Sequence, residues 1–374
     1  MNVGLVLPYL KAGGTERQAR YIARHLQASG HQVTFIVSEA TGAFAGEVQA
    51  ETISLDLPFR KATAPAFVFR LVRTVRDRQF DVLLSRAWNT NMVTAIAGLL
   101  SRTPYVLFLS GPTERRQQSR IRLAIEGFLL RRASKIISVS SAARKNCIRA
   151  YDLPQSLIQV IHNGIRIDEI QTQADKSSDD VARIPSGVFS VAFVGRINHR
   201  KGLDILLRSL SQLRRSRDGG QSDSSSEIHA WVVGGGDPQP YRAMVEEFGL
   251  EGQVHFLGEK ENPFPVMHRS DVFVLPSRSE GFPNVLLEAM ALGRPVLAAD
   301  CETGPNEIID GDNGRLFPVE DHDALADLLL EMRENPAIAE ELGQRARDTV
   351  RKNFGLQSQL SKIRRVVESA ATSV

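Results

Sequence analysis

The chain has 374 residues, more than one typical domain, and its 42% hydrophobic content excludes general disorder, so we expect two packed domains. The two cysteines, Cys147 and Cys301, are too few for a cysteine-rich zinc site and indicate a reducing compartment. The net charge is only +3, and no apolar run approaches the ~18 residues of a membrane-spanning helix, so we expect a soluble or peripheral protein.

The first half of the chain alternates apolar runs with segments of helical periodicity. Its N-terminal run lacks a basic n-region and is predicted to be a strand rather than a signal peptide. Strands are predicted at 2–7, 33–37, 81–84, 105–109 and 136–139, with helices at 15–29, 89–100 and 140–151. This alternation is typical of a parallel α/β sheet.

Gly13 and Gly14 stand at the first strand-to-helix junction. Because they have no side chains, backbone N–H groups there can approach a phosphate or a sugar. Paired glycines in loops are also common as simple turn-formers, so this pair leaves both interpretations open.

Residues 115–135 combine an apolar helical stripe with many cations and one internal acid, Glu126. The stripe consists of Ile121, Ala124, Ile125, Phe128 and Leu129, and the cations are Arg115, Arg116, Arg120, Arg122, Arg131, Arg132 and Lys135. Such a segment can rest on an anionic membrane, or it can be an ordinary sheet-covering helix with a solvated outer face. Nucleic acid is not expected as a partner, because the segment lacks a series of interleaved aromatics that would stack on bases.

A polar span, residues 166–186, is predicted to connect the two domains, with 176–180 as its exposed part. The second domain then opens with a strand at 188–194, and Arg196 and Lys201 follow in a strand-to-helix loop. A planar guanidinium and a compact ammonium suit a diphosphate, although loop cations can also be merely solvated. The next strand, 231–233, leads into Gly234 and two further glycines.

Residues 272–299 form a predicted strand–loop–helix–strand unit that carries two carboxylates. Glu280 lies in the turn at the carboxyl end of the first strand, and Glu288 lies one turn inside the helix, which starts near Pro283. The backbone N–H groups near Phe282 and Asn284 favour an anion at this edge of the sheet. The alternatives are a solvated turn residue at 280 and a helix-dipole stabiliser at 288.

Glu280 and Glu288, eight residues apart with Gly-Phe-Pro-Asn after the first, resemble the signature of retaining glycosyltransferases of family four. Gly13-Gly14-Thr15-Glu16, the Gly-Arg…Lys-Gly element at 195–202 and the glycines from Gly234 resemble further motifs of this family. The resemblance is strongest over 188–318. Many members have a histidine near the strand end at 105–109, where this chain has Ser110, so no catalytic histidine is transferred.

The resemblance implies an α/β fold of the GT-B type, with two Rossmann-like domains facing across a cleft. We expect an N-terminal acceptor-binding domain at 1–165, a linker at 166–186 and a C-terminal nucleotide-sugar-binding domain at 187–352. The last helix, at 353–374, is expected to cross back to the first domain.

The implied reaction is retaining transfer of a sugar from a nucleotide-sugar, preferably a UDP-sugar, to a lipid-linked saccharide at the inner membrane face. Expected catalytic residues are Glu280, Arg196 and Lys201, and expected donor-binding residues are Gly13, Gly14, Gly234, Phe282, Pro283, Asn284 and Glu288. No cofactor and no metal are expected, because the cations would replace magnesium. The alternatives are a nucleotide-sugar epimerase, a transferase with a soluble acceptor, and a catalytically silent donor-binding subunit.

Overall fold

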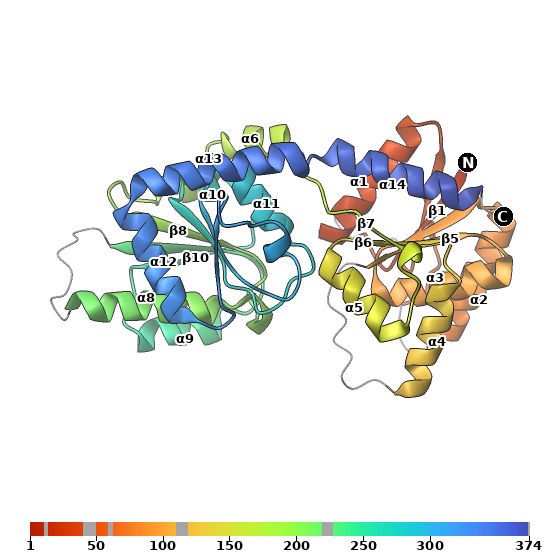
Figure 1. Ribbon diagram of the computed structural model, residues 1–374, viewed down its shortest axis with the longest axis horizontal. Coiled ribbons are helices and arrows are strands. Elements are labelled where there is room, and N and C mark those ends of the chain that lie inside the picture. The colour runs from red at the N-terminus through yellow and green to blue at the C-terminus, as the bar shows by residue number, and fades with distance from the viewer. Residues whose placement is uncertain (11–13, 40–49, 59–62, 110–118, 219–226, 373–374) are drawn as a thin grey trace. The chain divides into compact units, whose positions relative to one another are not determined.

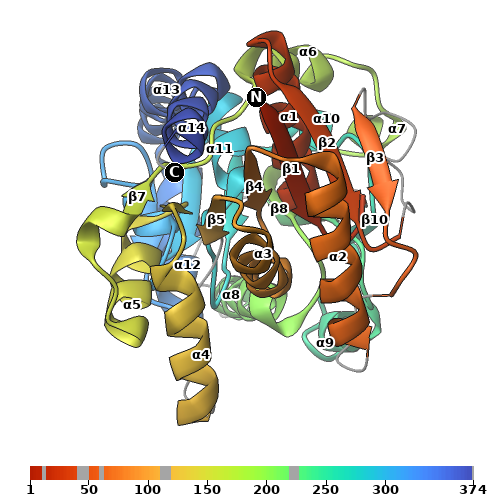
Figure 2. The same cartoon turned by 90° about the vertical axis from the view of Figure 1, so that its right-hand side faces the viewer.

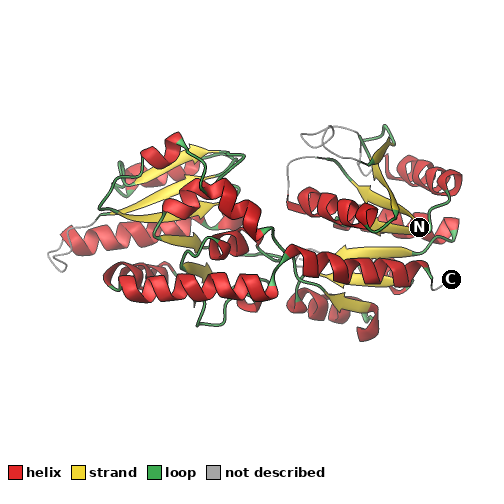
Figure 3. Ribbon diagram, turned by 90° about the horizontal axis from the view of Figure 1, so that it is seen from above, coloured by secondary structure: helices red, strands yellow, loops and turns green. Residues whose placement is uncertain are grey.

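The computed structural model describes residues 1–374 except 11–13, 40–49, 59–62, 110–118, 219–226 and 373–374. The chain divides into two compact units. Unit 1 comprises Met1–Asn163 and Gln357–Val374, and unit 2 comprises Gly164–Leu356. Each unit is a parallel sheet with helices on both faces (Figures 1 and 3), as the alternating pattern predicts.

Unit 1 contains a seven-stranded sheet in the order β3-β2-β1-β4-β5-β6-β7, with all pairs parallel. The strands are β1 (Asn2–Leu7), β2 (Gln32–Val37), β3 (Glu51–Ser54), β4 (Val82–Ser85), β5 (Tyr105–Leu109), β6 (Lys135–Ser138) and β7 (Ile158–Val160). The helices are α1 (Gly14–Ala28), α2 (Ala64–Arg78), α3 (Trp88–Ser101), α4 (Arg120–Arg131), α5 (Ser141–Tyr151) and α14 (Leu356–Ala371). The central strands are continuous apolar runs because helices bury both faces of the sheet.

Unit 2 contains a six-stranded parallel sheet in the order β10-β9-β8-β11-β12-β13. The strands are β8 (Phe189–Val194), β9 (Ile228–Val233), β10 (Val254–Gly258), β11 (Val272–Leu275), β12 (Val296–Ala299) and β13 (Arg315–Phe317). The helices are α6 (Ile167–Ala174), α7 (Asp179–Ala182), α8 (Leu203–Asp218), α9 (Gln239–Glu247), α10 (Phe264–Arg269), α11 (Asn284–Ala291), α12 (His322–Glu334) and α13 (Pro336–Asn353). The single 3₁₀ turns of unit 2 are η3 (His199–Lys201) and η4 (Pro305–Glu307), and η2 (Gln155–Leu157) belongs to unit 1.

The strand order of unit 2 reverses between β8 and β11. From β8 the chain adds β9 and β10 on one side, and then returns to place β11 on the other side of β8. Connections that leave in opposite directions open a crevice at the carboxyl ends of these two strands, where ligands of open α/β sheets bind. In unit 1 the corresponding reversal lies between β1 and β4.

Residues 166–186, predicted to be a linker, form α6 and α7 and belong to unit 2. The side chains of Ile170 and Ala174 are buried, and the carbonyl of Gln173 accepts a hydrogen bond from Asn262 at 2.8 Å. Lys260 pairs with Asp180 at 2.7 Å. The polar composition therefore reflects two short helices, each with one packed face, and Lys176, Ser177 and Asp179 in and beside the turn between them are exposed.

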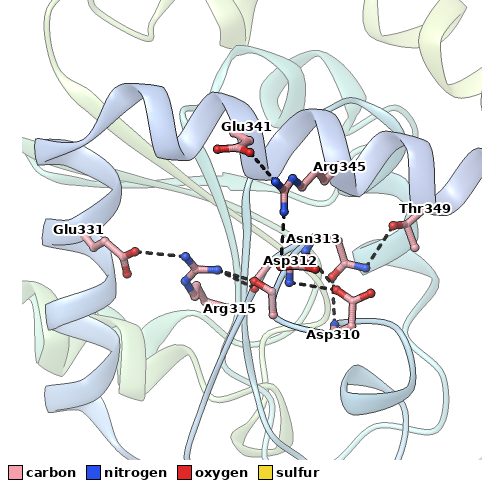
Figure 4. A network of polar contacts seen from close by, with 10 residues as sticks. Asp310, Asp312, Asn313, Arg315, Glu331, Glu341, Arg345 and Thr349 are labelled. Carbon is pink, nitrogen blue, oxygen red and sulfur yellow. Dashed lines mark hydrogen bonds and ion pairs between the residues drawn. The ribbon is translucent and has the colours of Figure 1, made fainter.

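The loop between η4 and β13 is fastened to α12 and α13 by a polar network (Figure 4). The buried Asn313 side chain donates to the carbonyl of Ile308 at 3.0 Å and to Thr349 on α13 at 3.3 Å. Its oxygen accepts from the backbone N–H of Asp310 at 3.1 Å. Arg315 pairs with Glu331 on α12 at 3.4 Å. These contacts hold the end of the sheet beside its covering helices.

Candidate functional site

The loop after β8 is shaped by a capped turn and a glycine. The Asn198 side chain accepts a hydrogen bond from the Lys201 N–H at 3.2 Å, which starts η3. Gly202 then takes a left-handed conformation, φ +68°, and a Cβ there would lie 1.9 Å from the carbonyl oxygen of Pro276. Only glycine allows this approach to the end of β11. The turn therefore directs Lys201 toward the crevice between β8 and β11.

Glu280 meets Lys201 in the turn after β11. Its Oε1 accepts from Lys201 Nζ at 2.5 Å and from the Ser277 hydroxyl at 2.7 Å, and the residue is 5% exposed. Arg200 is more distant, with Nη1 at 3.9 Å from Oε2. Lys201 and Ser277 together orient this buried carboxylate through two hydrogen bonds. The structure thus joins two of the three predicted catalytic residues at the strand-order reversal.

The loop after β12 is hydrogen-bonded to the turn that carries Glu280. Thr303 donates through its hydroxyl to the carbonyl of Glu280, and the Cys301 thiol donates to the carbonyl of Ser277 at 2.8 Å. Burial, and next the negative charge of Glu280, raise the pKa of Cys301 to about 12, so this thiol is a packing group rather than a nucleophile. The Glu280 carboxylate is consequently held in a fixed position.

Arg278 joins the β8 and β11 loops on the outer side of the same edge. It donates to both oxygens of Asp204, at 2.8 and 2.7 Å, and to the carbonyl of His199 at 2.7 Å. Its Nε donates to Glu320 at 2.7 Å. The backbone N–H of Arg278 also donates to the carbonyl of Arg200 at 2.8 Å. These bonds fix the turn that carries Lys201.

Arg196 and Gly234 lie on neighbouring loops at the same edge. Arg196 is exposed, and no hydrogen bond or ion pair of its side chain is found within the part of the chain that the structure describes. A Cβ at Gly234 would lie 1.8 Å from the carbonyl oxygen of Gly195, so this glycine lets the β9 loop pack against the β8 loop. Gly234 therefore shapes the loop that presents Arg196.

The four remaining predicted residues of unit 2 belong to the start of α11. Pro283 is buried at the N-cap, Asn284 is the first helical residue, and Glu288 follows one turn later and is half-buried. The Phe282 ring packs against Phe354, with ring centroids 5.8 Å apart, and is 6% exposed. Its side chain thus belongs to the packing under the helix, while its backbone leads into the N-terminus of α11.

The predictions for unit 1 are only partly within the described residues. Gly14 is the first residue of α1, directly after the β1 loop, whereas Gly13 and Ser110 lie outside the described residues. Arg86, which follows β4 at that unit's own strand-order reversal, is 2% exposed and has its guanidinium 4.5 Å from the Phe108 ring centroid. Desolvation lowers the pKa of Arg86 to about 10, against the opposing charge of Glu16.

Sequence reasoning missed Ser277, Asn198 and Thr303 as supports of the site. The roles of Ser277 and Asn198 could have been predicted from the sequence, because each is a small polar residue between a strand and a turn or helix, where such side chains commonly accept or donate capping hydrogen bonds. The role of Thr303 could not, since its contact with Glu280 spans 23 residues.

The described residues hold neither a metal-binding cluster nor a membrane-spanning helix. They contain no group of three or more His, Cys, Asp or Glu residues that could hold a metal ion. No helix among them is long and apolar enough to cross a bilayer.

Two Rossmann-like units define the GT-B class of glycosyltransferases, and solved structures of that class share this fold. A glycosyltransferase of Rickettsia africae superposes with a TM-score of 0.85 at 18% identity, covering 100% of this chain and 99% of that one. Anabaena HepE in complex with UDP gives a TM-score of 0.82 at 23% identity, covering 99% and 100%.

Family models match both halves of the chain, "Glycosyltransferase Family 4" over residues 12–169 and "Glycosyl transferases group 1" over 175–349. The phosphatidyl-myo-inositol mannosyltransferase of Mycobacterium leprae is 28% identical over 100% of this chain and 98% of its own length. A lipopolysaccharide core biosynthesis mannosyltransferase of Rhizobium leguminosarum, LpcC, is 28% identical over 80% and 81%. The chain belongs to glycosyltransferase family four and is a glycosyltransferase, as the sequence motifs predict.

Proposed function

We propose that this glycosyltransferase moves a sugar from a UDP-sugar to a lipid-linked saccharide, with retention at the anomeric carbon and without a metal ion. The observation that carries the proposal is the Lys201–Glu280 pair at the β8–β11 reversal, with exposed Arg196 on the same loop. The UDP complex of HepE supports the donor, and the relatives named for phosphatidylinositol and lipopolysaccharide core support the acceptor.

The cations of this edge suit the leaving group. When the bond between the sugar's anomeric carbon and the diphosphate oxygen breaks, negative charge develops on the departing phosphate. Arg196, Lys201 and the N–H groups at the start of α11 supply positive charge and hydrogen bonds to that oxygen. Lys201 is well suited to this role because Glu280 and the capped η3 turn hold it in place before the donor arrives.

Retention follows from attack on the face that the diphosphate leaves. The acceptor hydroxyl forms the new bond to the anomeric carbon, and its proton passes to the departing phosphate oxygen. An enzyme nucleophile is not required on this route. Glu280 is poorly suited to be one, since its Oε1 already accepts from Lys201 and Ser277. Its role is to position Lys201 and to face the donor sugar.

Glu288 is assigned to the ribose of the nucleotide. It lies four residues after Asn284, on the same face of α11 and one turn from the helix N-terminus. A carboxylate there can accept hydrogen bonds from two neighbouring hydroxyls while the N–H groups hold the diphosphate. Gly14 of unit 1 is assigned to the donor as well, through its backbone at the start of α1.

The site of action is the cytoplasmic side of the cell membrane, where nucleotide-sugars are available to the enzyme and a lipid-linked acceptor is embedded. The family relatives named for phosphatidylinositol and lipopolysaccharide acceptors support this location. Only the saccharide end of such an acceptor has to enter the site.

Transfer assays with the full chain test the proposal. With a UDP-sugar and a lipid-linked acceptor, we expect Lys201→Met to lower kcat by about 10²-fold or more, because one stabilising cation is lost. Arg200→Met is the matched control in the same turn, and we expect it to change kcat by less than about tenfold, since its guanidinium lies 3.9 Å from Glu280. Full activity of Lys201→Met would contradict the assignment.

The products decide the remaining parts of the proposal. The anomeric configuration in the product, measured by NMR, should match that of the donor, and EDTA should leave the rate unchanged. An inverted product or loss of activity in EDTA would refute retention or metal independence. Conversion of the UDP-sugar without any acceptor would show an epimerase, and turnover with GDP-sugars alone would refute the donor.

A further inference from the structure

Helix α4 of unit 1 is packed with its only acid facing inward. Glu126 is 4% exposed, accepts from the Tyr151 hydroxyl at 2.6 Å, and accepts from Arg122 Nε at 3.0 Å. Gly127, Leu129 and Leu130 complete the buried side of the helix. The carboxylate therefore fixes which face of α4 is turned toward α5 and which is turned outward.

The outward face carries large apolar side chains. Ile121 is 75% exposed, Ile125 55% and Phe128 50%, and their spacing places them along one stripe of the helix. Among the described residues, the other large apolar side chains that are this exposed, Phe69 and Leu100, stand singly on α2 and α3. Figure 2 shows α4 extending beyond the other helices of unit 1. Of the predicted stripe, Leu129 packs inward, whereas Ile121, Ile125 and Phe128 are exposed, so most of the apolar stripe is not covered by the described residues.

Cations border this stripe, and no acid on α4 is exposed. We define the α4 basic–apolar face as Arg120, Ile121, Arg122, Ala124, Ile125, Phe128, Arg131 and Arg132, all of which are exposed. Arg132 places its guanidinium 5.1 Å from the Phe128 ring centroid. Arg131 donates to the carbonyl of Tyr151 at 2.7 Å and lies 3.7 Å from the exposed Asp152 carboxylate, so its charge is partly offset, whereas Arg120 and Arg132 remain exposed.

The chemistry of this face selects its occupant. Burying the stripe against a second copy of the chain about a twofold axis would bring the two sets of arginines together, which is unfavourable. An anionic bilayer offers an apolar interior to the isoleucines and phenylalanine and phosphate groups to the arginines, whose long stems can reach them.

We propose that the α4 basic–apolar face docks the enzyme on an anionic lipid surface. The apolar stripe enters the headgroup region, and the flanking arginines bind the lipid phosphates. This goes beyond the transfer reaction, because docking requires neither a donor nor an acceptor.

Sedimentation of the full chain with lipid vesicles tests the proposal. The vesicles contain phosphatidylcholine alone, or phosphatidylcholine with phosphatidylglycerol. We expect the wild type to sediment with the anionic vesicles, more at low salt than at high salt. Ile125→Ser/Phe128→Ser and Arg120→Gln/Arg132→Gln should each weaken that binding by about tenfold. Circular dichroism should remain unchanged, since all four side chains are exposed.

Matched control variants distinguish binding through the α4 basic–apolar face from nonspecific binding of vesicles by other exposed residues. Phe69→Ser removes an exposed aromatic from α2, and Arg351→Gln/Lys352→Gln removes two exposed cations from α13; both should bind vesicles like the wild type. Equal binding by wild type and the α4 variants, or equal loss in the controls, would overturn the proposal. The proposal would also be overturned if the wild type did not bind anionic vesicles. A wild-type dimer in solution that Phe128→Ser converts to a monomer would overturn it as well.

Discussion

Asp204 shows how much of the candidate donor site depends on a single carboxylate. It receives both terminal nitrogens of Arg278, and that guanidinium also binds the carbonyl of His199 in the turn before Lys201. Desolvation works to raise the pKa of Asp204, but the hydrogen bonds and charge of Arg278 outweigh it, and the pKa is lowered. The ionised carboxylate is therefore stabilised by folding.

We predict that Asp204→Asn lowers the free energy of unfolding by about 2 kcal/mol at neutral pH, because one partner of a charged hydrogen-bonded pair is lost. The stabilisation is complete above the ordinary pKa of an aspartate, about 4, and disappears as the pH falls through the lowered folded-state pKa. Urea unfolding of both proteins at several pH values measures this. A difference that stays constant into strong acid would contradict the role of the ionised carboxylate.

The conformation of the loop between η4 and β13 likewise depends on one side chain, that of Asn313. Regular structure ends at η4, and the loop keeps its course because the Asn313 side chain replaces missing backbone partners (Figure 4). Through Thr349 it also fixes the loop to α13, whose end leads the chain back toward α14. One buried amide thus connects a loop, a strand and a covering helix.

We predict that Asn313→Ala lowers the free energy of unfolding by about 2 kcal/mol or more, because the carbonyl of Ile308 and the N–H of Asp310 lose their partner in a buried place. Asp312→Ala is the matched control in the same loop. It removes only an exposed ion pair with Arg345 and should cost less than about 1 kcal/mol. Similar urea midpoints for the two variants would show that the network in Figure 4 does not stabilise the loop.

At the scale of the whole molecule, each unit has a hydrophobic core of its own. The core of unit 2 gathers residues from 191 to 342, and the large core of unit 1 gathers residues from 6 to 158. The chain passes between the units after Asn163 and again after Leu356. A ligand that binds the β8–β11 edge should therefore stabilise the loops of unit 2 first.

Hydrogen exchange of the full chain with and without UDP tests this expectation. We predict the largest slowing of exchange at residues 195–202 and 280–288, because those N–H groups border the proposed diphosphate and ribose positions. At a UDP concentration of about 100 times Kd, the stabilisation of the bound state is about 2.7 kcal/mol. Protection confined to residues of unit 1 would contradict the placement of the donor.

The sequence by itself determined the elements whose residues are buried on both sides. The runs Asn2–Leu7, Tyr105–Leu109 and Val272–Leu275 could be predicted as strands because a parallel sheet needs continuous apolar residues. The strand–turn–helix at Glu280 and the family followed from local motifs. No prediction was made for Glu51–Ser54, an edge strand that is largely half-exposed, nor for Ala64–Arg78.

Tertiary structure alone decided the contacts between distant segments. Lys201 and Glu280 are 79 residues apart and meet only because β11 returns to the side of β8. In the polar span 166–186, α6 and α7 each pack one face against α10, a contact that composition alone could not reveal. On α4, the hydrogen bond from Tyr151 holds Glu126 on the buried side of the helix, and Ile121 and Ile125 therefore lie on the exposed side. Hydrophobic periodicity in the sequence shows which face of a helix is apolar. It does not show which residues cover that face, because those residues are distant in sequence and come close only in the folded chain.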